Sequence, residues 1–279
     1  MGRVDGKVAL ISGAARGQGR SHAIELAKEG ARIVAMDVTG GRLDGVEYHT
    51  ATADDMQETV RLVQQVGGQI VAGAADVRDR AAVDAVVAKG LDAFGYIDVV
   101  VANAGVFTWG AARDLTWDEW FTVIDINLNG TWNTVQSVLP SMIDRGKGGS
   151  IMMTASQIAT RGQSNAVAYA ASKSGIVGMM RALAAELAPL NIRVNTIHPS
   201  TVYTDMILNE PVYKVFRPDL ENPGVAEMEA ELRPFHMLPV AALDPIDVSH
   251  AVVYLASDES RYVTSLRFAL DAGSTQKLG

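Results

Sequence analysis

The sequence predicts an α/β fold: one Rossmann-type domain over residues 1–279, in which a doubly wound, seven-stranded parallel sheet carries helices on both faces. Three observations predict this architecture. Seven short apolar runs alternate with longer amphipathic stretches, as in a parallel sheet connected by helices. The first run enters a glycine-rich turn and then a helix, as dinucleotide-binding units do. A chain of 279 residues, 48% of them hydrophobic, can also bury one large core.

The composition narrows the classes of partner. A formal net charge of −8 makes nucleic acid and anionic membrane surfaces poor partners. The lack of cysteine excludes disulfides, thiolate metal sites and a cysteine nucleophile, and we expect no bound metal. Because the sequence shows no signal-peptide leader and no apolar run of about 18 residues, we expect a soluble, cytoplasmic protein.

The first strand is expected over residues 8–12, and the turn that follows it is the first candidate binding site. This turn reads Gly13-Ala14-Ala15-Arg16-Gly17-Gln18-Gly19, and an amphipathic stretch comes directly after it. Glycines let a backbone approach a pyrophosphate closely, and a helix N-terminus offers it free N–H groups. The alternative interpretation is a tight turn without a ligand. The cofactor-binding candidates in this turn are Gly13, Arg16, Gly17, Gln18 and Gly19.

The second strand, expected over residues 31–36, ends at Asp37. A carboxylate at this position is expected to bond the adenosine ribose hydroxyls and to repel a 2′-phosphate. Arg16 in the glycine turn weakly favours the phosphorylated cofactor. Because a carboxylate on the ribose itself outweighs an arginine nearby, the sequence predicts NAD, with NADP as the alternative.

Residues 39–55 form a connection without helical or strand periodicity. A connection longer than about 12–15 residues in a compact domain is usually functional or disordered. This one follows the expected adenosine site, so we interpret it as an insertion that folds over the cofactor. The alternative is a mobile surface insertion.

Two further strands carry candidate residues to the same edge of the sheet. After a helix at about 55–66, the strand at 69–75 ends at Asp76-Val77. The strand at 97–102 runs into Asn103-Ala104-Gly105. The glycine of this tripeptide lets the backbone pass close to a cofactor, and its asparagine can tie adjacent strands together. Open α/β sheets bind their ligands at these strand ends.

A long helix is expected over about residues 116–145. Asn127 interrupts its apolar pattern, and a buried asparagine needs hydrogen-bond partners. We expect Asn127 to open the helix locally and to hold a water molecule next to Lys173. The large apolar residues recur at helical spacing and are assigned to the core or to a subunit contact. They are Trp117, Trp120, Phe121 and Ile124.

Tyr169 and Lys173 stand four residues apart on the next predicted helix, which ends near Pro189, so they share one face. A phenol has a pKa of about 10, and a nearby ammonium favours the phenolate. The pair is therefore expected to act as a general acid/base toward an alcohol or a carbonyl. Ser156 follows a buried strand at about 149–155 and is expected to hold the substrate oxygen. The alternative is a surface tyrosine and lysine on an ordinary helix.

The last third of the chain is expected to hold a lid. The strand at 192–197 ends at His198, which we interpret as a packed core histidine. Prolines and scattered bulky side chains over residues 200–243 are typical of a lid over an apolar substrate. A helix at about 245–257 and a strand at 267–270 follow. The candidate substrate contacts are Phe107, Gln157, Met206 and Phe235.

The motifs are more specific together than any one of them, and Ser156 stands thirteen residues before Tyr169. In this combination the chain resembles the short-chain dehydrogenase/reductase family over essentially its whole length. The motifs that carry the resemblance are, in chain order, Ser12-Gly13-x-x-x-Gly17-x-Gly19, Asp76-Val77, Asn103-Ala104-Gly105, Asn127, Ser156 and Tyr169-x-x-x-Lys173.

The resemblance implies a role for each catalytic candidate. Tyr169 is the acid/base, and Lys173 lowers its pKa and bonds the nicotinamide ribose. Ser156 holds and polarises the substrate oxygen. Asn127 anchors a water that links Lys173 to bulk solvent.

The resemblance also assigns the cofactor contacts. The glycine turn takes the pyrophosphate, Asp37 the adenosine ribose and Asp76-Val77 the adenine edge. Ser200 is a departure, because the family usually has glycine there. The residues that line the cofactor or approach its carboxamide are Asn103, Ala104, Gly105, Pro199, Val202 and Thr204.

The glycine turn and the insertion at 39–55 are similar to those of the carveol-dehydrogenase-like, mycofactocin-linked subgroup. This resemblance implies a tightly held NAD that an external redox partner reoxidises, and the family at large implies a homotetramer. The leading hypothesis is an NAD-dependent dehydrogenase for a hydrophobic secondary alcohol, terpenoid- or steroid-like, or for the corresponding ketone. The alternatives are an NADPH-dependent carbonyl reductase and a non-catalytic dinucleotide sensor.

Overall fold

A computed structural model describes residues 2–277 and confirms the predicted sheet. The seven strands are β1 (Val8–Ser12), β2 (Arg32–Asp37), β3 (Ile70–Ala74), β4 (Val99–Ala102), β5 (Gly149–Thr154), β6 (Ile192–Pro199) and β7 (Arg267–Leu270). All neighbours pair in parallel, in the order β3-β2-β1-β4-β5-β6-β7. The strand order reverses between β1 and β4, so the ligand crevice is expected at the carboxyl ends of these two strands.

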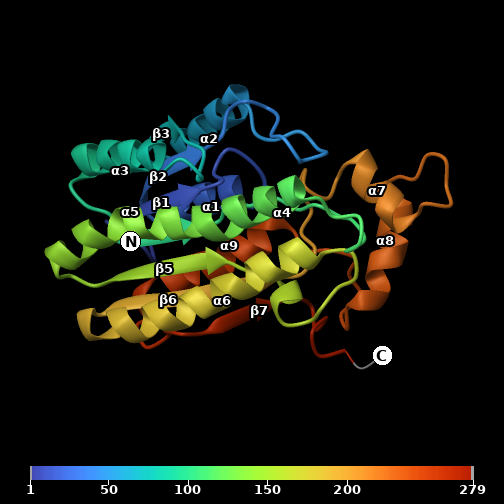
Figure 1. The fold of residues 1–279 in the computed structure, drawn as a ribbon. Helices are drawn as coiled ribbons and strands as arrows, with labels where there is room; N and C mark the ends of the chain where they lie inside the picture. The colour runs from blue at the N-terminus through green and yellow to red at the C-terminus, as the bar shows by residue number, and fades with distance from the viewer. Residues whose placement is uncertain (1, 278–279) are drawn as a thin grey trace.

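Helices cover both faces of this sheet (Figure 1). The α-helices are α1 (Gly17–Lys28), α2 (Ala53–Gln65), α3 (Arg80–Phe94), α4 (Trp117–Ile124), α5 (Gly130–Arg145), α6 (Val167–Leu187), α7 (Glu210–Phe216), α8 (Val225–Leu232) and α9 (Pro245–Ala256). Shorter turns are η1 (Asp125–Asn129), η2 (Gln157–Ala159), η3 (Ala188–Leu190), η4 (Arg233–Phe235) and η5 (Asp258–Ser260). α1, α2 and α9 pack on one face, and α3, α5 and α6 on the other. No helix within residues 2–277 has the length and apolarity needed to cross a bilayer.

Each face of the sheet closes its own hydrophobic core. Along β1, Leu10 belongs to the core beneath α3, α5 and α6, whereas Ala9 and Ile11 belong to the core beneath α1, α2 and α9. Side chains alternate between the faces of a strand, so a strand covered on both sides is apolar throughout. This is why the central strands read as continuous apolar runs in the sequence.

The long helix predicted over 116–145 is one helical run with a wider turn in its middle. α4 leads into η1, a π-helical turn of 5 residues, and α5 continues from it. Asn127 lies in this turn and is fully buried. The local opening expected at Asn127 is therefore present, and such π-turns occur frequently at functional sites.

The aromatic residues at the start of this run are not all part of the core. Trp117 is 72% exposed and Phe121 is 51% exposed, and their rings stack with centroids 5.5 Å apart. Trp120 packs partly against the core, and Val123 is the buried residue of α4. A core role is therefore wrong for Trp117 and Phe121. Helical spacing shows that residues share a face, but not what covers that face.

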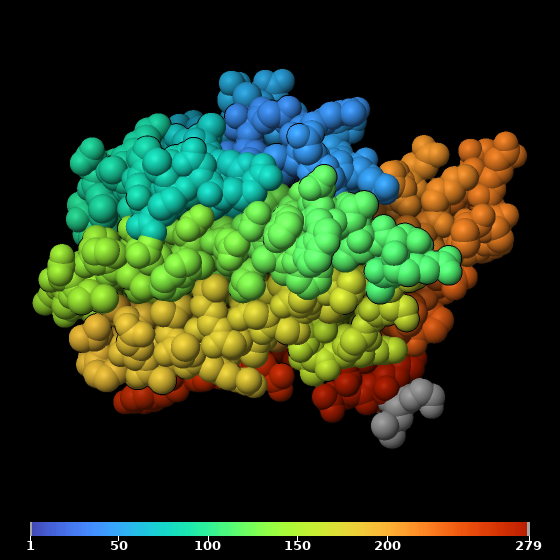
Figure 2. Space-filling view, in the orientation of Figure 1, coloured from blue at the N-terminus to red at the C-terminus, as the bar shows by residue number. Residues whose placement is uncertain are grey.

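The insertion at 39–55 is a folded loop. Gly40 and Thr52 pair as an isolated antiparallel bridge at its two ends. Thr52 then forms a capping box with Asp55, so that α2 begins at Ala53, slightly before the predicted start. In Figure 2 the blue surface of this insertion and the orange surface that follows residue 200 lie next to each other at one end of the molecule.

The segment 200–243 folds as a separate, smaller unit at the edge of the sheet. It contains α7 and α8 and has its own apolar cluster, which includes Val212, Met228 and Leu232. This cluster is distinct from the two cores on the faces of the sheet. Val202, near the start of the segment, belongs to the core beneath α1, α2 and α9. The segment is therefore anchored to the packing of the sheet and placed to cover a site at the strand ends.

Candidate active site

The carboxyl ends of β1, β4 and β5 meet at one edge of the sheet, and Asn103 joins them. Its side-chain amide donates to the carbonyl oxygens of Ser12 and Gly13, both at 3.3 Å, and accepts from the Thr154 hydroxyl at 3.3 Å. Asn103 therefore ties adjacent strands together as predicted. These bonds set the path of the backbone toward Gly105.

The turn between β1 and α1 needs glycine for two different reasons. Gly13 and Gly17 have φ values of +67° and +54°, in the left-handed region that favours glycine. At Gly19 a Cβ would lie only 1.9 Å from the Gly13 carbonyl oxygen. Arg16, the N-cap residue, makes no side-chain cap bond, and the first turn of α1 has no acidic residue. The first N–H groups of α1 are therefore available to an anionic ligand such as a phosphate.

A cavity of about 130 Å³ lies among this turn, the end of β2 and the insertion. Asp37 lines it, and its carboxylate accepts the N–H groups of Ala15 and Val38 at 2.9 and 2.8 Å. Burial raises the pKa of Asp37 to about 6, although these two hydrogen bonds act in the opposite direction. At neutral pH the carboxylate is therefore mostly charged, which disfavours a 2′-phosphate beside it.

The structure brings most predicted cofactor residues to this cavity. Gly19 lies instead in the packed part of the turn, and Pro199 and Val202 line the adjoining larger cavity. The Asp76 carboxylate is already engaged by the Arg78 guanidinium at 2.6–3.0 Å. The predicted residues that line the smaller cavity are Gly13, Arg16, Gly17, Gln18, Asp37, Asp76, Val77, Asn103, Ala104, Gly105 and Thr204.

The Arg16 side chain is directed toward two segments that border the cavity. Its guanidinium donates to the His49 carbonyl oxygen in the insertion and pairs with Asp205 at 3.1 Å. Arg16 therefore does not support the phosphorylated cofactor, because its guanidinium is turned toward these two acceptors. The same contacts connect the insertion to the segment 200–243.

Tyr48 connects the insertion to Phe107, next to Tyr169. Its hydroxyl accepts the Phe107 N–H at 3.1 Å, and the side chain is almost completely buried. The Phe107 ring in turn packs edge-on against the Tyr169 ring, with centroids 4.8 Å apart. Tyr48 was not among the sequence candidates, because a single aromatic residue in an irregular loop gives no periodic signal.

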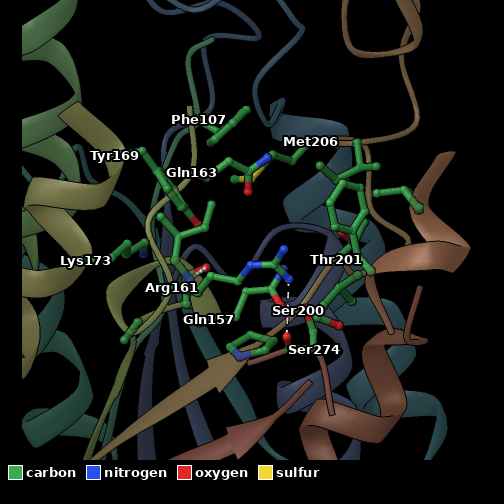
Figure 3. Close-up of a pocket in the computed structure, with 18 of the residues that line it drawn as sticks. Phe107, Gln157, Arg161, Gln163, Tyr169, Lys173, Ser200, Thr201, Met206 and Ser274 are labelled. Atoms are coloured by element: carbon green, nitrogen blue, oxygen red, sulfur yellow. Dashed lines mark hydrogen bonds between the residues drawn. The ribbon is translucent and has the colours of Figure 1, made fainter. Parts of the chain in front are cut away.

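Tyr169, Lys173 and Ser156 line one cavity together, and in Figure 3 Tyr169 points into that cavity. The Lys173 ammonium lies 5.5 Å from the centroid of the Tyr169 ring and donates to the Thr154 carbonyl oxygen at 2.8 Å. Ser156 follows β5 and is 7% exposed. The three predicted residues therefore converge at the strand ends.

Burial shifts the pKa of both Tyr169 and Lys173. Burial raises the pKa of Tyr169 to about 12, and the Ser156 hydroxyl acts in the opposite direction. Burial also lowers the pKa of Lys173 to about 8. Desolvation penalises the charged forms of both groups, so the lowering of the Tyr169 pKa by Lys173 stays a prediction. Positive charge beside the phenol would act against this desolvation.

Asn127 is held in place from both sides of its amide. Its Oδ1 accepts the Val106 N–H at 2.8 Å, and its Nδ2 donates to the Val106 carbonyl at 2.9 Å and to the Ser172 hydroxyl at 3.2 Å. A Cβ at Gly105 would lie 3.2 Å from Asn127 Oδ1 and 3.4 Å from Lys173 Nζ. Asn127 and Lys173 therefore flank the same glycine, and a water between them stays a prediction.

His198 supports Ser156 through the main chain. Its Nδ1 bonds to the Ser156 carbonyl oxygen and its Nε2 to the Thr196 hydroxyl, both at 2.9 Å. Burial lowers the pKa of His198 to about 4, so the ring is neutral at physiological pH. The interpretation of His198 as a packed histidine is confirmed.

The cavity in front of Tyr169 has a volume of about 420 Å³, and all four candidate substrate contacts line it. Aromatic rings continue from Phe107 to Trp109 at 5.3 Å, and from Trp109 to Phe216 of α7 at 6.0 Å. Trp109 was not predicted, because it lies in an irregular stretch after β4. The four predicted contacts are Phe107, Gln157, Met206 and Phe235.

The unusual Ser200 has a hydrogen-bond partner in this structure. Its hydroxyl bonds to His236 Nε2 at 2.9 Å, and both residues line the larger cavity. The departure from glycine at this position therefore adds a polar contact between the end of β6 and the segment 200–243. Within residues 2–277, no group of three or more His, Asp or Glu side chains is arranged to hold a metal ion.

Comparisons with known proteins agree with this geometry. The family described as short chain dehydrogenase matches residues 7–211. The chain is 42% identical over 278 residues to (−)-trans-carveol dehydrogenase of Rhodococcus erythropolis, covering 99% of this chain and 100% of that protein. It is similar to the crystal structure of carveol dehydrogenase from Mycobacterium avium in complex with NAD, with a TM-score of 0.97, 46% identity and coverage of 99% and 100%. It is also similar to a short chain dehydrogenase from Mycobacterium paratuberculosis bound to NAD, with a TM-score of 0.89, 41% identity and coverage of 99% and 100%.

Proposed function

The chain belongs to the short-chain dehydrogenase/reductase family and is an NAD-dependent oxidoreductase, and from this premise we propose that it oxidises a hydrophobic secondary alcohol with Tyr169 as the general base. One observation carries the proposal. Tyr169, Ser156 and Lys173 converge on an apolar cavity that adjoins the glycine turn and Asp37.

The residues of the smaller cavity fit NAD. The Asp37 carboxylate would accept hydrogen bonds from the adenosine ribose, and the first N–H groups of α1 would hold the pyrophosphate. Gln18 Oε1 and Thr50 Oγ1 are buried polar atoms without a partner among the described residues, and both residues line this cavity. Polar groups of a dinucleotide would satisfy them. Bound here, NAD would supply the acceptor for the hydride of the carbinol carbon.

Side chains of the protein would accept and transfer the proton of the substrate hydroxyl. Ser156 holds the substrate oxygen, and Tyr169 takes the hydroxyl proton as the carbon is oxidised. Because burial alone raises the pKa of Tyr169 to about 12, its basic form depends on positive charge from the Lys173 ammonium and the oxidised nicotinamide. Lys173, with a pKa of about 8, can pass the proton onward, and a water at Asn127 would carry it to solvent.

The lining of the larger cavity supports an apolar substrate, terpenoid- or steroid-like. Phe107, Trp109 and Phe216 form a continuous aromatic wall that begins at the Tyr169 ring. Met206 adds an adaptable apolar surface. A rigid hydrocarbon alcohol would bury most of its area against these side chains, which is the main source of affinity for such ligands.

We also propose that the insertion at 39–55 and the segment 200–243, together called the cover, make NAD slow to leave. Arg16 joins the insertion to Asp205, and Tyr48 joins the insertion to Phe107. A cofactor enclosed by these contacts would be reoxidised in place by an external redox partner of the mycofactocin-linked type. The exposed, stacked Trp117 and Phe121 supply an apolar surface for the subunit contacts of a homotetramer.

One experiment tests the activity and the cover separately. Purified protein is dialysed, its retained cofactor is identified by mass spectrometry, and formation of bound NADH is then followed by absorbance on addition of secondary alcohols. We expect retained NAD that apolar secondary alcohols reduce. If no alcohol produces NADH in NAD-loaded protein, even with an artificial electron acceptor present, the proposed activity is wrong. Cofactor-free protein that exchanges NAD rapidly would contradict only the cover.

A further inference from the structure

The cavity in front of Tyr169 has a polar part that a purely apolar alcohol does not need. Arg161 and Ser274 line it, and Figure 3 shows the Arg161 side chain extending into the cavity and bonded toward Ser274. We propose that Arg161 and Ser274 bind a second oxygen of the substrate, a carboxylate most strongly. The preferred substrate is then an apolar secondary alcohol that carries an acidic group away from the reacting carbon. This inference rests on the proposed function, because it names the substrate class of the same site.

The charged side chains that line the cavity favour a substrate with an anionic group. Lys173 and Arg161 are the two Lys or Arg residues that line the cavity, and Lys173 is committed to the Thr154 carbonyl. No Asp or Glu lines the cavity among residues 2–277. Within residues 2–277, Arg161 therefore has no counter-ion in the cavity, and a ligand carboxylate is the natural partner for its planar guanidinium.

Arg161 is an exposed residue, and among the described residues most of its hydrogen-bonding capacity has no protein partner. A guanidinium has five N–H donors in a fork. Within the described residues, the Arg161 guanidinium makes one hydrogen bond, from Nη1 to the Ser274 carbonyl oxygen at 3.3 Å, and it lies 5.5 Å from the centroid of the Phe235 ring. The Phe235 ring and the Ser274 carbonyl orient the fork without using up its donors.

The Ser274 hydroxyl is a second, independent sign of a ligand. Ser274 is 1% exposed, and its Oγ has no hydrogen-bond partner among the described residues. Buried polar groups are almost always hydrogen-bonded, so a group left free at a cavity wall indicates a ligand that completes it. The Arg161 guanidinium can only donate, and the Ser274 hydroxyl can donate too, so the partner they share is an acceptor oxygen.

The short segment between Ser156 and Arg161 should fix the distance between the two oxygen atoms that a substrate can place in the site. Ser156 holds the reacting oxygen, and η2 connects it to Arg161 through a tight turn in which the Arg161 N–H bonds the Gln157 carbonyl at 2.9 Å. One short, hydrogen-bonded segment therefore carries both polar contacts. A substrate that engages both must have its two oxygens at a matching separation, so we expect an optimum when that separation is varied.

The test compares two matched series of substrates on the NAD-loaded protein. One series is alkan-2-ols of increasing chain length, and the other is the hydroxy acids in which a carboxylate replaces the terminal methyl group. We measure kcat/KM for formation of NADH and take the ratio of acid to alcohol at each length. We expect the ratio to exceed unity at an optimum length. In Arg161→Met it should fall by about 10–100-fold, as for loss of a charged hydrogen bond.

Three other variants refine the interpretation. Arg161→Lys keeps the charge without the planar fork and should retain part of the preference for acids. Ser274→Ala should lower the ratio several-fold. Arg113→Met makes the same substitution at a residue whose side chain is 87% exposed and lies outside this cavity, and it should leave the ratio unchanged. Methyl esters of the acids show how much of the preference requires the negative charge.

The outcomes separate this inference from the proposed function. If alcohols are oxidised but the ratio is the same in wild type and Arg161→Met, the proposal that Arg161 binds an acidic group of the substrate is wrong. The proposed alcohol dehydrogenase activity then stands. If Arg161→Met lowers kcat/KM equally for both series, Arg161 merely supports the fold. If neither series is oxidised, the proposed function fails. Carboxylic acids without a hydroxyl then decide the inference, since they must raise the Tm of wild type more than that of Arg161→Met.

Discussion

Two regions border the site, and they are stabilised in different ways. One is the wall, which here means the buried side of the site with the candidate catalytic residues Asn127, Ser156 and Lys173. The other is the cover. Asn127, Lys173 and Ser156 are 0%, 3% and 7% exposed. Hydrogen bonds join Asn127 to the loop after β4 and Lys173 of α6 to the end of β5. Of the contacts that hold the insertion and the segment 200–243, the one between Tyr48 and Phe107 is buried. The pair between Arg16 and Asp205 lies near the surface, where the Asp205 side chain is 61% exposed. Local opening is easiest where few buried contacts exist. We therefore expect the packed core to determine the chemistry, and the partly exposed contact between Arg16 and Asp205 to influence exchange of the cofactor.

The largest effect is expected at Tyr169. Tyr169→Phe removes the proton acceptor and keeps the ring that packs against Phe107, so kcat for alcohol oxidation should fall by about 10²–10⁴-fold. NAD retention should stay at the wild-type level, because the change lies in the wall and not in the cover. Rapid kinetics of NADH formation and mass spectrometry of the bound cofactor measure the two quantities. A variant that keeps its turnover would remove Tyr169 from the chemistry.

The next largest effect is expected on stability, and it tests how much the wall depends on the hydrogen bonds of Asn127. Asn127→Ala leaves the N–H and carbonyl of Val106 without their partner, so the free energy of unfolding should fall by about 2–4 kcal/mol. Urea denaturation measures the change. Asn129→Ala is the matched control on the same π-turn, since the exposed Asn129 side chain bonds only Asp125, and its effect should stay within about 0.5 kcal/mol. Equal stability of the two variants would show that the wall does not depend on Asn127.

The third prediction uses pH to neutralise the charge that selects the cofactor. The pKa of Asp37 is raised to about 6, so its carboxylate is charged at neutral pH and becomes neutral as the pH falls through 6. The ratio of Kd for NADP to Kd for NAD should therefore fall, by about tenfold between roughly pH 7 and pH 5. Calorimetric titrations measure both constants. In Asp37→Asn the ratio should be low at every pH, and a pH dependence that survives in this variant would assign it to another group.

The smallest effect is expected in the cover. Asp205→Ala removes one partner of Arg16 and should raise the dissociation rate of NAD by roughly two- to fivefold, as expected for loss of a partly exposed ion pair. Displacement of bound NAD by a labelled excess measures the rate. Asp219→Ala is the control, because it breaks a similar pair with Arg217 in the same segment without touching Arg16. If both variants exchange NAD equally fast, the Arg16 contact does not close the site.

Local pattern was sufficient for much of the molecule. The strand predicted at 267–270 has those bounds, and the expected opening at Asn127 is a π-helical turn. The glycine turn follows its strand and begins a helix as predicted. Periodicity, turn chemistry and motif order are properties of neighbouring residues, and both faces of a covered parallel sheet impose them strongly. The predicted catalytic residues meet for the same reason, since each follows a strand or lies on the helix beside one.

Contacts between distant parts of the chain were beyond the reach of such patterns. The hydroxyl of Tyr48 meets the backbone of Phe107 across 59 positions, and Arg161 meets Ser274 across 113. The exposure of Trp117 depends on what lies over α4, which helical spacing does not contain. The raised pKa of Tyr169 depends on how much water packing removes. By itself the sequence determined the sheet, the glycine turn and the candidate catalytic residues that meet at the strand ends. The tertiary structure alone decided the cover, the polar part of the cavity and the ionisation of the phenol, because these arise from desolvation and long-range contact.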